Sequence, residues 1–440
     1  MLTPKSLSFT RLRKLCSDLV QTFPETRVGK NVQISSHDIV MSALACMFYQ
    51  DASLLQFQRR LASKRHRSNL HSQFGLSRIP KESQMKVVLD QIPSQQFEIL
   101  FKQLFHRLQR AKYLKAFESP LGGYLCALDG TQYYWSSKVR CKNCLKFNKK
   151  TGVMWSHRVV QAALVHPEQK TVIPFMPMEI SNDYQGQDMT QDNERRGAHR
   201  LIESLKRTHC RLPLTLLGDA LYAEQPCIRL VKEKGYHFIF TVKPNRHRYL
   251  YHSIEGQLQE KSLVKKGKKH TYRWAINHPL THDANSEQVN YISYTIASPS
   301  GGGVYKTTYS GGWVTNHVPH EDNIDDLVQS ARCRWRIENE CFNKLKNQGY
   351  HLTHNYGHGE QFLGFNFFIL TLLAFFIHQV LRQSNPLFKK ALTYAGSKKR
   401  LWEELRSIIR WAVFDSWEQL LQAFLDTDSV DVRIREGPSN

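Results

Sequence analysis

Three acidic residues stand at positions from which carboxylates can converge on metal ions. Asp129 and Asp219 each follow a short apolar run, and Glu338 lies in a segment with helical apolar spacing. We expect each Asp at the carboxyl end of a buried strand, where side chains point into a crevice at the sheet edge. Arg334 precedes Glu338 by four residues, so both are predicted on one face of an amphipathic helix.

Three convergent carboxylates suit phosphodiester chemistry. Two divalent cations ~3.5–4 Å apart can activate a water or a 3′-hydroxyl and stabilise the leaving oxygen. Mg²⁺ prefers oxygen ligands and keeps waters and substrate phosphates as its remaining ligands. Each Asp by itself is equally typical of a turn after a strand. The prediction of a metal site therefore depends on the combination of the three.

Composition limits the class of protein and its partners. The chain has 440 residues, which indicates two or three structural units, and its formal net charge is +23. A positive field of this size favours polyanions, either nucleic acid or an anionic membrane surface. The nine cysteines are scattered, and the start of the sequence has no apolar core of a signal peptide. These features predict a reducing, cytoplasmic location.

One apolar run, residues 362–377, resembles a membrane segment in composition. A membrane span needs ~20 apolar residues, and this run is shorter. It also contains Gly364 and Asn366. We therefore predict a buried core helix and no membrane association.

Apolar periodicity predicts an α/β chain with a mixed sheet flanked by helices. Strands are expected at 124–128, 159–166, 171–178, 214–219 and 237–242, and helices at 193–207 and 223–234. The expected organisation is a helical DNA-binding domain (1–118), a catalytic core in two parts (119–243 and 323–385, the second carrying the Glu helix), a β-rich insertion (244–322) and a C-terminal helical region (386–440).

Three motifs carry a resemblance to a known family. ALDGT at 127–131, GDALYA at 218–223 and RWRIENECFNKLK at 334–346 resemble the DDE transposases of bacterial insertion sequences, in the branch with a β-strand insertion before the catalytic Glu. The resemblance implies an RNase H-like fold, with Mg²⁺- or Mn²⁺-dependent DNA cleavage and strand transfer. It also implies that Asp129, Asp219 and Glu338 are the catalytic, metal-binding triad.

The chain departs from the family pattern around the Glu. Arg334 matches the motif Arg, but the motif Tyr falls at Ala331 and the motif Lys at Leu345. Lys346 is the better substitute by helical phase, since eight residues after Glu338 return near the same face. The family also holds a flipped base on an aromatic residue of the last insertion strand. Trp313 is the candidate for this DNA contact, with a core Trp as the alternative.

Cys141, Cys144 and His157 form a candidate zinc site. A CxxC pair followed by a His suits Zn²⁺, although a full site needs a fourth ligand, for which His166 and Cys126 were considered. The alternative is an unmetallated pair of thiols. For the histidines between 351 and 358 we expect DNA contact or packing and no further metal.

A basic cluster near residue 60 is the best candidate for binding the phosphates of double-stranded DNA. The alternative is a solvated helix face. Its members are Arg59, Arg60, Lys64, Arg65 and Arg67. A second basic run lies at 261–269. Asp183, Asp188, Asp192 and Glu194 are expected to be solvated residues that open a helix, with supporting carboxylates of the metal site as the alternative.

The favoured function is a transposase that acts on double-stranded DNA as a homodimer or larger assembly, because two element ends must be brought together. Two alternatives stay open at the level of sequence. One is a metal-dependent nuclease without strand transfer, and the other is a DNA-binding inhibitor that does not cut. The basic N-terminal region and the insertion favour the transposase, because both suit recognition of element ends.

Overall fold

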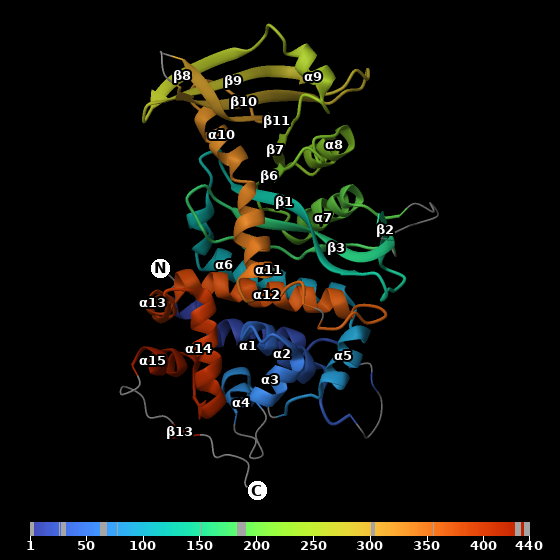
Figure 1. Cartoon of the computed structure of the whole chain (residues 1–440), viewed down its shortest axis with the longest axis vertical. Helices are drawn as coiled ribbons and strands as arrows, with labels where there is room; N and C mark the ends of the chain where they lie inside the picture. Colours follow the sequence, from blue (N-terminus) through green and yellow to red (C-terminus); the bar gives the residue numbers. More distant parts are fainter. Residues whose placement is uncertain are drawn as a thin grey trace.

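The structure is a computed structural model of the whole chain. It describes residues 4–25, 27, 32–61, 68–76, 78–150, 152–182, 191–300, 304–354, 356–426 and 433–434. Figure 1 shows a sheet-containing half above a helical half, with one long helix, α12 (Leu363–Ser384), between them.

The centre of the sheet consists of β1 (Tyr124–Ser136), β3 (Gly152–Val165), β6 (Leu214–Gly218) and β7 (His237–Thr241). β1, β6 and β7 are parallel neighbours in that order, and β3 pairs antiparallel with the other edge of β1. β6 is buried along its whole length, as its continuous apolar sequence predicts. This is the RNase H-like mixed sheet that the sequence predicted.

Three short strands pair with β3 and extend the sheet on that side. β2 (Leu145–Lys149) forms a hairpin with the start of β3, and β4 (Ile173–Pro174) and β5 (Met178–Ile180) pair with the rest of β3. The sequence had predicted one strand over 171–178, but the strand breaks at residues 175–177, where Pro177 lacks a backbone donor.

The β-rich insertion continues the same sheet. It contains α9 (Arg248–Ser253), β8 (Gln259–Lys265), β9 (Lys268–Pro279), β10 (Gln288–Pro299) and β11 (Tyr305–Thr315). β11 pairs antiparallel with β7, so the order runs β2-β3-β1-β6-β7-β11-β10-β9-β8 within an 11-stranded sheet. The insertion strands and the catalytic strands therefore share one hydrogen-bonded framework.

Helices cover both faces of the central strands. α7 (Glu194–Thr208) and α8 (Gln225–Glu233) lie on one face, while α10 (Ile324–Arg332), the π-helical segment η5 (Ile337–Phe342) and α11 (Asn343–Asn347) cross the other (Figure 1). Asn193 caps α7, because its side chain accepts a hydrogen bond from the Arg196 backbone N–H. This cap fixes the start of α7, and with it the position of Glu194.

The helical half interleaves the two ends of the chain. Phe48 contacts the rings of His378, Trp402 and Trp417, so N-terminal, α12 and C-terminal residues share one core. The N-terminal elements are η1 (Pro4–Leu7), α1 (Phe9–Val20), α2 (Ser36–Phe48), α3 (Leu54–Leu61), α4 (Asn69–Phe74), α5 (Glu82–Gln91), η2 (Ser94–Phe97), α6 (Glu98–Arg110) and η3 (Tyr113–Phe117). The C-terminal elements are α13 (Pro386–Ala395), α14 (Lys398–Trp411), α15 (Trp417–Leu425) and the short pair β12 (Ala412–Val413) and β13 (Arg433–Ile434).

α12 is the apolar run that resembled a membrane segment. By length and composition it is apolar enough to cross a membrane, but 94% of its most apolar window is buried inside the protein. It packs against α2, α5 and α13 on one side and β4 on the other. The predicted core helix is therefore confirmed, and it joins the helical half to the sheet.

Candidate active site

Asp129 and Asp219 lie beside each other on neighbouring strands. β1 and β6 are parallel, and Ala127 is the register partner of Leu217. The pairing ends at this level, and Asp219 directly follows β6, close enough for its charge to act on Asp129. Each carboxylate accepts a local backbone N–H: Gly130 donates to Asp129 at 2.9 Å, and Leu221 donates to Asp219 at 2.7 Å.

The predicted turn after Asp129 does not exist. β1 continues to Ser136, because the polar stretch from Asp129 to Gln132 keeps pairing with β3 from Gln161 to Arg158. Asp129 therefore sits in mid-strand, held by its pairing with Gln161 of β3. This position is more rigid than a turn.

Glu338 approaches the two Asp residues from η5, with Arg334 between them. The Arg334 Nη1 atom lies 2.6 Å from Glu338 Oε1 and 3.4 Å from Asp129 Oδ2. One guanidinium thus bridges two of the predicted triad carboxylates. The predicted placement of Arg334 and Glu338 on one face is confirmed by this ion pair.

The helix that carries Glu338 differs from the prediction. The amphipathic helix expected around Arg334 and Glu338 is not a regular α-helix: α10 ends at Arg332, and Glu338 lies in the π-helical segment η5 before α11. A π-helical turn is uncommon and is found most often at functional sites. Its effect here is to place the carboxylate of Glu338 near β1.

Glu194 is a fourth carboxylate at this site, which the sequence analysis had placed among solvated loop acids. A Cβ atom built on Gly130 would lie 2.3 Å from Glu194 Oε2, so the carboxylate rests directly on the strand residue after Asp129. The buried Tyr222 hydroxyl donates to Glu194 Oε1 at 2.9 Å. The only signal in the sequence is the glycine, which leaves room for an approaching side chain.

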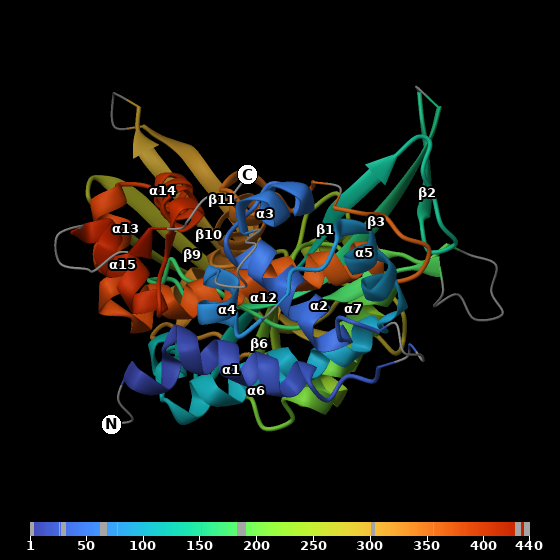
Figure 2. The ribbon, with the colours of Figure 1, turned by 90° about the horizontal axis from the view of Figure 1, so that it is seen from below.

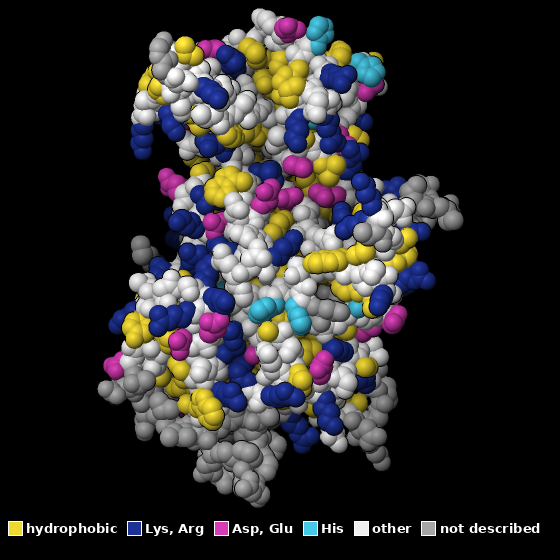
Figure 3. Space-filling view, viewed as in Figure 1, with side chains coloured by type: hydrophobic (Ala, Val, Ile, Leu, Met, Phe, Trp, Pro, Cys, Tyr) yellow, Lys and Arg dark blue, Asp and Glu magenta, His cyan; other side chains and the backbone are white. Residues whose placement is uncertain are grey.

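Crowding of like charges perturbs the site. Burial, followed by repulsion from Glu338, Glu194 and Asp219, raises the pKa of Asp129 to about 7, although Arg334 acts in the opposite direction. Burial and the charge of Asp219 also raise the pKa of Glu194. Figure 3 shows acidic side chains gathered at the level of α10, β6 and β1, with Lys and Arg above and below them. An oxygen-rich, mutually repelling donor set fits a hard divalent cation.

Of the two lysines that flank the motif position, Lys346 faces the site. Burial lowers the pKa of its ammonium, and the charge of Asp129 acts in the opposite direction. Lys344 instead pairs with Glu340 and donates to the Lys170 carbonyl, away from the carboxylates. The helical-phase argument for Lys346 is consistent with this arrangement.

The basic cluster near residue 60 divides into different environments. Arg59 is exposed on α3, as a phosphate contact requires. Arg60 is 8% exposed, and its Nε donates to Asp51 Oδ1 at 3.0 Å, so the prediction of a DNA contact is wrong for Arg60. Its position faces the core because it lies next to Leu61 on the inner side of α3. Lys64, Arg65 and Arg67 lie outside the described residues.

Trp313 is a core residue. It is 5% exposed, pairs in β11 with Thr241 of β7, and packs over Gly311. Its ring therefore offers no open face to a base, and the prediction of a DNA contact is corrected. Trp335, three residues before Glu338, is 44% exposed and lies under the Arg336 guanidinium. The sequence analysis had not singled it out.

The three predicted zinc ligands come together, and His358 joins them. The ligand atoms of Cys141, Cys144, His157 and His358 all lie within 4.8 Å of one another. Cys126 is buried in β1, outside this group, and His166 accepts a hydrogen bond from the Glu168 backbone. His358, for which DNA contact or packing was expected, packs against Tyr134 and His157 beside the two cysteines.

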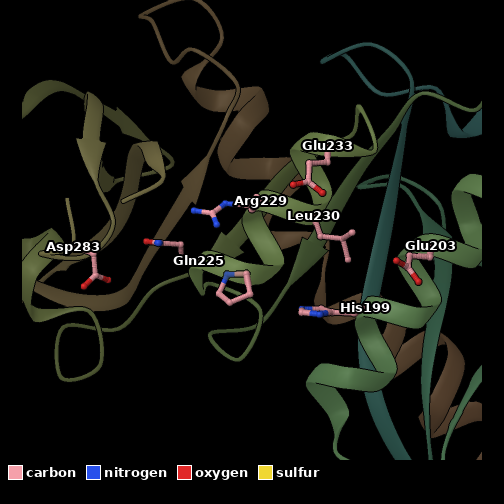
Figure 4. A pocket seen from close by; sticks show the side chains of 8 residues that line it. His199, Glu203, Gln225, Arg229, Leu230, Glu233 and Asp283 are labelled. Carbon is pink, nitrogen blue, oxygen red and sulfur yellow. The ribbon is translucent and has the colours of Figure 1, made fainter. Parts of the chain in front are cut away.

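An open pocket elsewhere contains none of the four carboxylates. Figure 4 shows it between α7, α8 and the loop that carries Asp283. Its charged lining mixes both signs and includes His199, Glu203, Arg229, Glu233 and Asp283. We assign the chemistry to the carboxylate cluster, where groups of one charge converge.

Comparison with known proteins agrees with the fold. No curated protein matches the sequence at a significant level. Residues 184–376 match the family model described as a transposase DDE domain, a span that contains Asp219, Glu338 and the whole insertion. The open mixed sheet flanked by helices is the architecture that this domain requires. This match supports a DDE transposase of the insertion-sequence type.

Proposed function

We propose that the carboxylates of Asp129, Asp219 and Glu338 hold two divalent cations, Mg²⁺ or Mn²⁺, for DNA cleavage at element ends and strand transfer into target DNA. The observation that carries the proposal is the approach of these acids to one another from β1, the end of β6 and η5, with Arg334 bridging Asp129 and Glu338. When bound, such cations supply charge neutralisation at the scissile phosphate and an activated oxygen nucleophile.

The position of each side chain determines its role in the proposed reaction. Asp129 and Asp219 offer oxygens from adjacent strands, where both ions can share them. Glu338, 48% exposed at the edge of the cluster, can turn toward an arriving ion once Arg334 releases it. Arg334 and Lys346 then remain as cations beside the site and can position the phosphates of DNA.

Both reactions are in-line phosphoryl transfers that form no covalent protein intermediate. In the first, a water oxygen bonds to phosphorus at the element end and the 3′-oxygen leaves as a hydroxyl. In the second, this 3′-oxygen attacks a target phosphodiester and displaces the target's 3′-oxygen. The proton of each attacking oxygen is lost, and each leaving oxygen gains one, so the atoms balance.

Two projecting hairpins support a DNA-binding role for the face that carries the site. Figure 2 shows the β2–β3 hairpin and the β10–β11 hairpin rising on the same side of the molecule. Exposed lysines border both regions: Lys146, Lys149 and Lys150 at the first, and Lys265, Lys266, Lys268 and Lys269 at the turn between β8 and β9 beyond the second. We propose that DNA lies between them, with a homodimer synapsing two ends.

The test is a joining assay. The protein is incubated with labelled DNA from the flanks of its reading frame, a target plasmid and Mg²⁺, and joined products are measured. We expect joining that stops when Mg²⁺ is omitted. Nicking without joining would support the nuclease alternative, and binding without nicking would support the inhibitor.

Glu194 provides a test of the fourth carboxylate. We expect Glu194→Gln to lower the cleavage rate by roughly 10–100-fold, because residues that support metal ligands typically contribute that much. The matched control is Glu203→Gln, an exposed acid on the same helix. Rates are compared under single-turnover conditions at several Mg²⁺ concentrations. Equal rates for both variants would remove Glu194 from the site.

A further inference from the structure

Four side chains from three separate segments form a compact group at the base of the β2–β3 hairpin. Cys141 and Cys144 precede β2, His157 lies on β3, and His358 comes from the loop before α12. We propose that these four residues bind one structural zinc ion. The proposal is independent of the carboxylate site and of its chemistry.

The spacing of the four ligand atoms matches a tetrahedron around zinc. With Zn–S bonds of about 2.3 Å and Zn–N bonds of about 2.05 Å, tetrahedral angles require separations of about 3.8 Å for S···S, about 3.6 Å for S···N and about 3.3 Å for N···N. The Cys141 and Cys144 sulfurs are 3.8 Å apart. The Cys141 sulfur lies 3.5 Å from His157 Nε2, and the two histidine Nε2 atoms are 3.1 Å apart.

The contacts of Cys144 agree with the same geometry. Its sulfur lies 3.3 Å from His157 Nε2 and 3.4 Å from His358 Nε2. A disulfide would instead require the two sulfurs to be about 2.05 Å apart. The separation thus excludes a disulfide in this conformation.

An oxygen lies near the second nitrogen of each imidazole. His358 Nδ1 lies 2.7 Å from the Gly359 carbonyl oxygen, and His157 Nδ1 lies 3.3 Å from Glu179 Oε1. Glu179 itself accepts a hydrogen bond from the Tyr133 hydroxyl at 2.8 Å. These partners favour a proton on each Nδ1, so both Nε2 lone pairs point into the same space. Two facing lone pairs repel each other unless a cation or a proton lies between them.

The loop that carries His358 is held in place by other contacts. The Asp90 carboxylate accepts backbone N–H groups from Glu360, Gln361, Phe362 and Leu363 at 2.9–3.0 Å. Gly359 has φ +70°, and a Cβ there would meet Asp90 at 2.4 Å, so the loop requires glycine at this position. The Asn143 amide also donates to the Gln361 carbonyl at 3.3 Å. The site is therefore built before a metal arrives.

The donor set indicates a structural role. Four protein ligands leave no open position for substrate, which distinguishes structural from catalytic zinc. Two thiolates neutralise the dication. The ion would fasten the β2–β3 hairpin, which we propose lies beside DNA, to the start of α12 in the helical core. It would thereby hold the hairpin at a fixed angle to the catalytic sheet.

The test measures metal in the purified full-length protein, prepared with a phosphine reductant and without chelator. We expect about one zinc per chain by mass spectrometry, and loss of most of it in Cys144→Ser and His358→Ala. The matched controls are Cys210→Ser and His320→Ala, two exposed residues outside the group, which should keep the zinc. Zinc-free wild type, or equal zinc in Cys144→Ser and wild type, would overturn the proposal.

If the ligand variants fail to fold, cobalt substitution tests the proposed metal site instead. Co²⁺-substituted wild type should show the intense visible bands of tetrahedral cobalt and a thiolate charge-transfer band. His358→Cys should keep the metal and raise the charge-transfer band by about one half, because three thiolates replace two. An unchanged band in a folded His358→Cys variant would exclude His358 as a ligand. Neither measurement depends on DNA cleavage, so failure here leaves the transposase proposal standing.

Discussion

Asp219→Ala should abolish DNA cleavage while leaving DNA affinity nearly unchanged. Asp219 directly follows β6, the parallel neighbour of β1, so its removal deletes one of the oxygens that the two cations would share. A metal site contributes several kcal/mol of transition-state stabilisation, which corresponds to a loss on the order of 10³-fold in rate. Single-turnover cleavage of labelled ends measures the loss, and a gel-shift assay measures affinity.

The control is a substitution of a second acid, which changes the net charge of the protein by the same amount. Asp322→Ala removes a surface carboxylate beside α10, outside the cluster, and should cleave at the wild-type rate. Retention of cleavage in Asp219→Ala would contradict the assignment. A parallel loss of DNA binding would show that the residue acts through folding or DNA contact instead.

Arg60→Ala should destabilise the protein strongly, whereas Arg59→Ala should not. Arg60 and Asp51 are 8% and 2% exposed and form a buried ion pair, with the guanidinium also 5.0 Å from the Tyr49 ring centroid. Removing one partner leaves an uncompensated buried charge, which costs roughly 3–5 kcal/mol of unfolding free energy. The neighbouring Arg59 is exposed, and its loss should change stability by less than about 0.5 kcal/mol.

Urea denaturation and DNA binding separate the two roles. Arg59→Ala should lower DNA affinity and reduce its salt dependence, because one phosphate contact is lost. The double variant Asp51→Leu/Arg60→Met should recover much of the stability lost in Arg60→Ala, because no charge stays buried. If the urea midpoint of Arg60→Ala equalled that of the wild type, the buried ion pair would contribute nothing to stability.

The sequence located most elements of the central sheet, because short apolar runs bounded by polar residues have few alternatives. Residues 214–218 and 237–241 are strands almost as predicted. The length of β1 was missed because the residues after Asp129 are polar, and only their pairing with β3 keeps them extended. The insertion strands were recognised by alternation, but their continuation of the central sheet depends on the contact between β11 and β7.

Some residues of the candidate site were recognised in the sequence and others were not, because only some belong to a local motif. Asp129, Asp219 and Glu338 were found through motif order, and the i,i+4 relation of Arg334 and Glu338 through helical geometry. Glu194 and His358 were noticed in the sequence, but their local spacing did not show what they would meet. Glu194 reaches Gly130 only because α7 packs against β3 and β5. His358 reaches His157 across 201 residues because the loop before α12 is fixed by Asp90.

By itself, the sequence determined the α/β class, the basic character of the chain, the three motif acids and the CxxC pair. Each of these features depends only on residue types and on their spacing over a few positions, so it can be recognised without knowing how the chain packs. Only the tertiary structure decided which charged residues face solvent and which are buried. It separated Arg59 from Arg60 and placed Trp313 in the core, because burial depends on what packs against each face. It also brought Glu194 to the carboxylates and His358 to the Cys141–Cys144–His157 group, because side chains remote in sequence meet only where helices, strands and loops pack.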